Sequence, residues 1–189
     1  MNTTLWLFVF VLLVGLIGLV CRRRVRAEFN QPNGLSRLTV AVIWFVYLSH
    51  LTITLYASLS GLWELTVPNM LRYTVGGGLT ISGLFLMIAG GISFGSLRRV
   101  NGKADDQLIT TGIYRWSRNP QNVGWILALL GISILGKSGF ALLMTGLFIV
   151  RFVSYVKEEE KHLETQFGQE YCDYRERTPR YFGLPNPGK

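Results

Sequence analysis

Two polar segments in the last third of the chain contain the residue types that chemistry requires. The first, T-G-I-Y-R-W-S-R-N-P-Q-N-V-G-W, runs from Thr111 to Trp125, and the second, K-E-E-E-K-H-L-E-T-Q-F-G-Q-E-Y-C-D-Y, runs from Lys157 to Tyr174. Both lie directly beside long apolar runs, where charged side chains are costly and generally mark a functional site. We therefore expect a reaction site at one face of a membrane.

The sequence S-R-N-P in the first segment predicts a helix start that can bind an anion. Proline is tolerated at the first helical position and asparagine can accept a free backbone N–H, so Asn119 should cap a helix that begins at Pro120. The unpaired N–H groups and positive dipole of this helix then face Tyr114 and Arg118. Such a cradle suits a carboxylate or phosphate. A capped membrane helix with arginine and tryptophan anchors at the interface is the alternative.

Three adjacent carboxylates, Glu158, Glu159 and Glu160, lie in the second segment where a helix should leave the bilayer. Consecutive helical residues turn by about 100°, so the three side chains cannot share one face. At least one is expected to point toward the loop that carries Tyr114 and Arg118. The alternative is an acidic run that is solvated throughout.

Apolar residues continue past the carboxylates at helical spacing. Leu163, Phe167, Tyr171 and Tyr174 recur at intervals of four, four and three. This pattern predicts an amphipathic helix that continues from the last membrane span and packs its apolar stripe on the bundle.

Composition and apolar runs indicate how these segments are positioned. With 49% hydrophobic and 16% charged residues, the 189-residue chain fits one compact membrane domain better than a soluble core. A membrane helix needs about 20 apolar residues, and three runs approach or exceed that length: Leu5–Val20, Leu38–Leu59 and Tyr73–Phe94. In the third run, Gly91 and Gly95 are spaced to let another helix approach closely, and Gly76, Gly77, Gly78 and Gly83 make the same helix thin.

A fourth apolar region, Val123–Val156, is interrupted by Gly136, Lys137, Ser138 and Gly139. Glycine-rich punctuation of this kind predicts a tight turn between two antiparallel helices. We therefore predict an all-α, polytopic membrane helix bundle of about five spans with a cytosolic amphipathic C-terminal helix. We treat residues 1–189 as one domain, with a three-helix N-terminal part (1–95) and a C-terminal cofactor-binding half (96–189).

The basic residues predict the orientation of this bundle. Seventeen of the nineteen Lys and Arg residues fall on one side of the predicted spans, and only Arg72 and Lys137 fall on the other. The positive-inside rule then places the N-terminus outside and the C-terminus in the cytosol. Anionic lipid, rather than nucleic acid, is the expected partner of these clusters. His50 lies within a predicted span with no second ligand at metal-binding spacing, so we expect no metal site.

The two polar segments together resemble a known enzyme family. T-x-G-x-Y-x-x-x-R-[HN]-P-x-x-x-G-W, a short hairpin, R-F, E-E-x-x-L-x-x-x-F-G-x-x-Y-x-x-Y and T-P-R follow one another in this chain. This order is similar to that of the isoprenylcysteine carboxyl methyltransferases and their phospholipid methyltransferase relatives. The resemblance covers roughly residues 84–183, and it is specific because two motifs recur at the right separation around a hairpin.

The resemblance implies an integral membrane methyltransferase that uses S-adenosylmethionine and receives a membrane lipid or lipidated acceptor from the bilayer. Together with the cradle at Arg118, it places the cofactor contacts at Gln107, Leu108, Ile109, Tyr114, Arg118, Asn119, Pro120, Gln121 and Asn122. It places acceptor positioning and cofactor enclosure at Arg151, Glu159 and Glu160. Family members usually have His where this chain has Asn119 and Tyr where it has Asn122.

The residues leave the acceptor and two other functions open. A carboxylate acceptor needs no base, whereas an ammonium acceptor must first lose a proton, which Glu159 or Glu160 could receive. Membrane sterol reductases, which bind NADPH, are similar in their C-terminal half, and R-N-P-Q-N partly matches their R-x-P-N-Y pattern. A non-catalytic lipid-binding subunit is the remaining alternative.

Overall fold

The computed structural model describes residues 3–29, 35–95 and 107–186, and its regular elements are helices. Five of them are long: α1 (Thr3–Phe29), α2 (Arg37–Leu59), α4 (Gly77–Phe94), α6 (Pro120–Leu135) and α7 (Gly139–Phe167). The shorter elements are α3 (Asn69–Leu71), the π-helical turn η1 (Arg72–Gly76), the 3-10 turn η2 (Gly112–Arg115) and α8 (Gln169–Arg177). The predicted all-α fold is thus confirmed.

Three of the described helical stretches are long and apolar enough to cross a membrane: Arg37–Leu59, Asn69–Phe94 and Gly139–Phe167. Helix α6 is apolar but shorter. Large apolar side chains on these helices, such as Leu48 and Ile88, are exposed, as expected for a surface that meets lipid. The membrane character of the chain agrees with the prediction, while the count of five spans stays a prediction.

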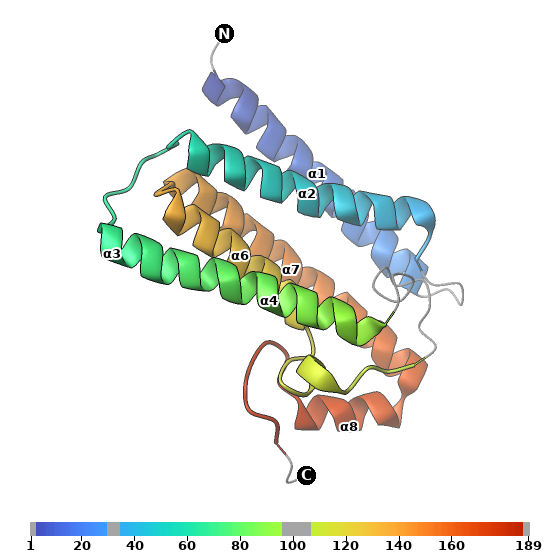
Figure 1. Cartoon of the computed structure of the whole chain (residues 1–189). Coiled ribbons are helices and arrows are strands. Elements are labelled where there is room, and N and C mark those ends of the chain that lie inside the picture. The colour runs from blue at the N-terminus through green and yellow to red at the C-terminus, as the bar shows by residue number, and fades with distance from the viewer. Residues whose placement is uncertain (1–2, 30–34, 96–106, 187–189) are drawn as a thin grey trace.

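The long helices pack side by side in a bundle (Figure 1). Helix α4 packs mainly on α6, α2 packs on α6 and α7, and α1 packs on α2 and α7. The turn η2, helix α8 and the C-terminal segment gather at one end of this bundle, beside the start of α6. The polar segments therefore meet at a single end. Residues 96–106 lie outside the described part of the chain. The expected domain boundary falls at the start of this range, and the range includes the basic residues Arg98, Arg99 and Lys103.

Glycines determine how closely α4 and α6 approach. A Cβ atom added to Gly83 would lie 2.5 Å from the backbone nitrogen of Ala128 and 2.6 Å from the carbonyl oxygen of Gly124. Gly76, the last residue of η1, and Gly131 of α6 make a second approach of this kind. Backbones at this distance tolerate no side chain between them.

Of the glycines expected in this role, Gly76 and Gly83 take it, whereas the pair Gly91 and Gly95 does not. A Cβ on Gly91 would meet the nearest side-chain atom, Nε2 of Gln121, only at 3.6 Å, and Gly95 has open space around it. Gly95 instead ends α4 in the left-handed conformation, with φ of 66°. The close approaches follow the seven-residue spacing of Gly76 and Gly83, because residues seven apart return to the same helix face.

The hairpin between α6 and α7 is the tight turn that the sequence predicts. Lys137 adopts a positive φ of 50°, and its ammonium group pairs with Glu64 at 3.1 Å. Ser138 caps α7, because its hydroxyl accepts from the backbone N–H of Ala141 at 3.1 Å.

The amphipathic tail differs from the prediction in one respect. Helix α7 runs without interruption from the bundle through the carboxylates to Phe167, as expected. Gly168, with φ of 54° and ψ of −124°, then ends it and redirects the chain into α8. Tyr171 and Tyr174 are buried on this second helix rather than on a continuation of the first. The spacing alone did not reveal the break, because the turn preserves the apolar stripe.

The close approach of α4 and α6 makes a direct prediction. Gly83→Ala should lower the free energy of unfolding by about 1–3 kcal/mol, the usual cost of overpacking, because the neighbouring atoms belong to backbone. Gly78→Ala, on the same helix with nothing within 4 Å, is the matched control and should be neutral or slightly stabilising. Thermal unfolding of both variants in lipid nanodiscs measures the difference. Equal stability of the two variants would show that the helices separate more easily than their packing implies.

Candidate functional site

A cavity of about 200 Å³ lies at the end of the bundle where the polar segments meet. Helix α2 and Phe29 of α1 form one side, and the start of α6, the charged part of α7 and helix α8 form the other. The cavity thus draws on both the N-terminal and the C-terminal parts of the chain.

Most of the predicted site residues line this cavity. They are Gln107, Leu108, Ile109, Tyr114, Arg118, Asn119, Gln121, Asn122, Glu159 and Glu160. Two predicted residues are not part of its lining. Pro120 is buried against α4, and its Cγ is 3.5 Å from where a Cβ on Gly90 would lie. Arg151 lies deeper in the bundle.

The side chain of Arg151 faces α1. Its Nη2 donates to the carbonyl oxygen of Val14 at 2.8 Å. Gly18 leaves the space that the guanidinium occupies, since a Cβ there would overlap it. Glu159 is two helical turns farther along α7, which corresponds to about 12 Å. The structure therefore brings together the two predicted carboxylates but not Arg151.

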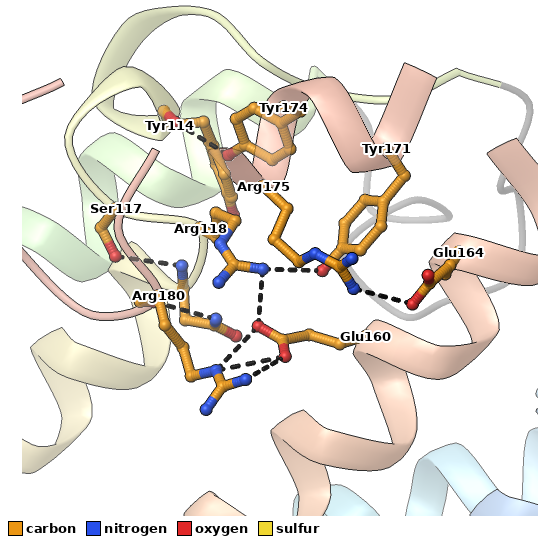
Figure 2. A network of polar contacts seen from close by, with 10 residues as sticks. Tyr114, Ser117, Arg118, Glu160, Glu164, Tyr171, Tyr174, Arg175 and Arg180 are labelled. Atoms are coloured by element: carbon orange, nitrogen blue, oxygen red, sulfur yellow. Dashed lines mark hydrogen bonds and ion pairs between the residues drawn. The ribbon is translucent and has the colours of Figure 1, made fainter. Parts of the chain in front are cut away.

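A buried ion pair joins the two polar segments. Nη1 of Arg118 is 2.8 Å from Oε1 of Glu160, and the two side chains are only 8% and 11% exposed. Arg118 Nη1 also donates to the Tyr171 hydroxyl at 3.1 Å. Arg180 approaches Glu160 from the C-terminal segment, with Nη2 2.7 Å from Oε2 (Figure 2). The prediction that at least one carboxylate would face Arg118 is confirmed.

The charges of this cluster act on the groups around it. Hydrogen bonding to Glu160 raises the pKa of Arg180 further above its usual range. Burial, together with the nearby Glu160 carboxylate, raises the pKa of Tyr171 to about 12. Burial and then the charge of Glu159 also raise the pKa of Tyr114. Both phenols, which belong to the cavity lining, are therefore neutral near pH 7.

The C-terminal segment, residues 178–186, lies across the loop that precedes α6, and we call this segment the strap. The backbone N–H of Arg118 donates to the carbonyl of Pro179 at 3.0 Å, and that of Gly183 donates to Trp116 at 3.1 Å. From α8, the Tyr174 hydroxyl donates to the carbonyl of Tyr114 at 2.8 Å. These contacts hold the loop against α8 and the C-terminal segment, and Figure 2 shows the bond from Tyr174.

Asn119 takes the predicted position but not the predicted role. It immediately precedes α6, which begins at Pro120 as expected, yet its side chain makes no capping hydrogen bond. Its Nδ2 instead donates to the carbonyl of Arg180 at 3.1 Å, and its backbone N–H donates to the Ser117 hydroxyl at 3.0 Å. The capping prediction was wrong, because the side-chain amide of Asn119 binds the C-terminal segment instead of a backbone N–H of α6.

Residues of the first two helices complete the cavity, and sequence reasoning missed them. Tyr47 of α2 donates from its hydroxyl to Oδ1 of Asn122 at 2.6 Å. Phe29, the last residue of α1, stacks on His162 with ring centroids 4.4 Å apart, and its carbonyl is 2.7 Å from Nδ1 of His162. No motif in the sequence links these residues. Arg180 was also missed, although it belongs to the T-P-R that carries part of the resemblance.

The adjacent acidic side chains of α7 have two different sets of contacts. Glu158 pairs with Arg22 at 3.5 Å and with Arg26 at 3.8 Å, so it attaches α7 to the end of α1. Glu159 and Glu160 line the cavity. Within the described part of the chain, no group of three His, Cys, Asp or Glu residues has the geometry of a metal site.

The part of the chain that forms most of this site matches a known family. Residues 71–170, more than half of the chain, match the family model described as phospholipid methyltransferase. The chain belongs to the phospholipid methyltransferase family. This confirms the resemblance drawn from the two motifs. The matched residues include α4, η2, α6 and α7, whereas Tyr47, Tyr171 and Arg180 lie outside them.

Curated relatives are named as isoprenylcysteine methyltransferases. The protein-S-isoprenylcysteine O-methyltransferase of Mus musculus is 32% identical over 100 residues, which is 52% of this chain and 35% of the relative. The Homo sapiens protein of that name is 36% identical over 87 residues, 45% of this chain and 30% of the relative. The chain thus spans about a third of the length of these relatives. A probable protein-S-isoprenylcysteine O-methyltransferase of Oryza sativa subsp. indica is 26% identical over 153 residues, 80% of this chain and 78% of the relative.

The buried ion pair predicts a stability difference between two carboxylates of α7. Glu160→Gln leaves the guanidinium of Arg118 without its counter-charge, and breaking a buried pair costs on the order of 3 kcal/mol. Glu164→Gln breaks an exposed pair with Arg175 and should cost less than about 1 kcal/mol. Thermal unfolding of both variants in nanodiscs measures the difference. If the two substitutions destabilised the chain equally, Glu160 would not hold the two segments together.

Proposed function

We propose that this chain is an integral membrane methyltransferase that uses S-adenosylmethionine and methylates a carboxyl or amine group of a lipid-like or prenylated acceptor. The observation that carries the proposal is the meeting of the two polar segments in one cavity around Arg118 and Glu160. The family match and the names of the relatives support the same activity.

The groups that line the cavity fit this cofactor. Nε of Arg118 is buried and has no hydrogen-bond partner among the described residues, so it is a donor ready for a ligand carboxylate. The N-terminal turn of α6, which carries Gln121 and Asn122, adds free backbone N–H groups and a positive dipole. The aromatic rings of the cavity suit a cationic sulfonium. When bound, the cofactor supplies an activated methyl group.

The residues of the chain contribute placement, exclusion of water and one possible proton acceptor. Aromatic side chains of α2, α6, α7 and α8 line the cavity and limit the water that it can hold, and the C-terminal segment holds the loop that carries Arg118. Orientation of two reactants can lower a barrier by up to about 7–11 kcal/mol. For an amine acceptor, Glu159, which lines the cavity, accepts the proton that the ammonium group must lose. A carboxylate acceptor needs no such base.

The membrane setting favours an acceptor with a lipid tail. Trp44 and Tyr47 of the apolar helix α2, with Trp125 of α6, line the cavity on the side of the membrane helices. A tail that remains in the bilayer can thus accompany a head group that enters the cavity. The distribution of basic residues supports a cavity on the cytosolic side, with the N-terminus outside.

Equilibrium binding tests the cofactor. Wild-type protein in lipid nanodiscs should bind radiolabelled S-adenosylmethionine saturably, and NADPH should not compete. Asn119→His should retain or improve binding, because it restores the usual family residue. Asn119→Ala should weaken binding by about two- to tenfold, because the loop before α6 loses its hydrogen bond to the carbonyl of Arg180.

Asn69→Ala, at an exposed position at the other end of the bundle, is the control and should bind like wild type. If wild type does not bind and Asn119→His does not restore binding, the methyltransferase proposal fails. Saturable binding of NADPH alone would favour a reductase of sterol-reductase type.

Methyl transfer tests the role of Glu159. With phosphatidylethanolamine as acceptor, Glu159→Gln should lower the transfer rate by about 10²–10⁴-fold through loss of the general base. Binding of S-adenosylmethionine and thermal stability should change little. Glu164→Gln, on the exposed face of the same helix, should keep the wild-type rate. Undiminished transfer to the amine by Glu159→Gln would assign proton removal to another group.

A further inference from the structure

The hydroxyl of Tyr47 makes a contact that crosses the boundary of the family match. It donates to Oδ1 of Asn122 at 2.6 Å, and both residues line the cavity. Asn122 lies within the matched residues 71–170, whereas Tyr47 belongs to α2 and lies outside them. The first half of the chain therefore reaches the site at this point.

The ring of Tyr47 is held firmly enough to fix the position of its hydroxyl. It stands edge-on to Trp125 of α6, with centroids 5.3 Å apart at 81°. It is also edge-on to Phe148 of α7, with centroids 5.2 Å apart at 89°. Phe148 is buried with Leu129 in the core of the bundle. Contacts with two other helices thus leave the ring of Tyr47 little freedom to rotate.

The hydrogen bond determines what Asn122 can offer to a ligand. An asparagine side chain has one acceptor oxygen and one NH₂ donor group, and rotation by 180° exchanges their positions. With Oδ1 held by the Tyr47 hydroxyl, Nδ2 is the atom of this amide that remains for a ligand. Asn122 then meets a hydrogen-bond acceptor, such as a hydroxyl, ring nitrogen or carboxylate oxygen.

We propose that Tyr47 is a positioning residue for cofactor binding, which acts by orienting the Asn122 amide so that its NH₂ group faces the ligand. The inference rests on the proposed function, because the ligand is taken to be S-adenosylmethionine. The role is separate from packing, because it belongs to the hydroxyl and not to the ring. It also gives α2 a direct part in the site.

A double-mutant cycle tests this role in the full chain in lipid nanodiscs. Tyr47→Phe keeps the ring and removes the hydroxyl, and it should raise the Kd for radiolabelled S-adenosylmethionine about two- to tenfold. Asn122→Leu should raise the Kd by at least as much. Tyr47→Phe in the Asn122→Leu background should have no further effect, because the hydroxyl acts only through the amide. In turnover, Tyr47→Phe should raise KM for the cofactor and leave kcat near wild type.

Tyr56→Phe is the matched control, since it removes a hydroxyl from an exposed position of the same helix and should leave the Kd unchanged. Thermal unfolding of Tyr47→Phe should stay close to wild type, which separates positioning from packing. If wild type binds the cofactor and Tyr47→Phe binds equally well, the positioning role is overturned while the proposed function stands. Additive effects of the two substitutions would also overturn it. Absence of binding to wild type overturns both.

Discussion

The ion pair between Arg118 and Glu160 is the contact on which the site depends. It joins a loop before α6 to the charged part of α7, across the membrane hairpin that separates them in sequence. Both charges are nearly excluded from water, where an unpaired charge is costly. Arg180 and the Tyr171 hydroxyl stabilise the buried charges, because Arg180 pairs with Glu160 and the hydroxyl accepts a hydrogen bond from Arg118. An arrangement in which the two segments separate therefore leaves several buried groups unsatisfied at once.

Packing deep in the bundle determines whether these groups can meet. The backbones of α4 and α6 touch at Gly83 and Gly124, which places the start of α6 close to the end of α4. Helix α6 is rigid, so its position within the bundle fixes the loop that carries Arg118. Glu158, which pairs with Arg22 and Arg26, similarly fixes α7 relative to α1. The polar end is thus supported by contacts that make no direct contribution to the chemistry.

Sequence reasoning succeeded where the determinant was local. One proline indicates the helix start at Pro120, the glycine-rich punctuation indicates the hairpin, and helical rotation requires the three carboxylates to face different ways. It failed where a distant segment decided the outcome. The side-chain amide of Asn119 does not cap α6, because it donates to the carbonyl of Arg180, sixty-one residues later in the chain. The contribution of Tyr47 could not be seen, because the packing of α2 against α6 leaves no periodic signal.

The strap has a consequence for the order in which the site is made. Arg180 follows every membrane helix in the chain, yet it supplies part of the pairing of Glu160 and bonds to Asn119. Arg180 is therefore the last of these partners to be synthesised. Until Arg180 reaches it, Glu160 lacks its second guanidinium and relies on Arg118 alone. The helices of this protein can therefore pack before the polar network at their end is complete.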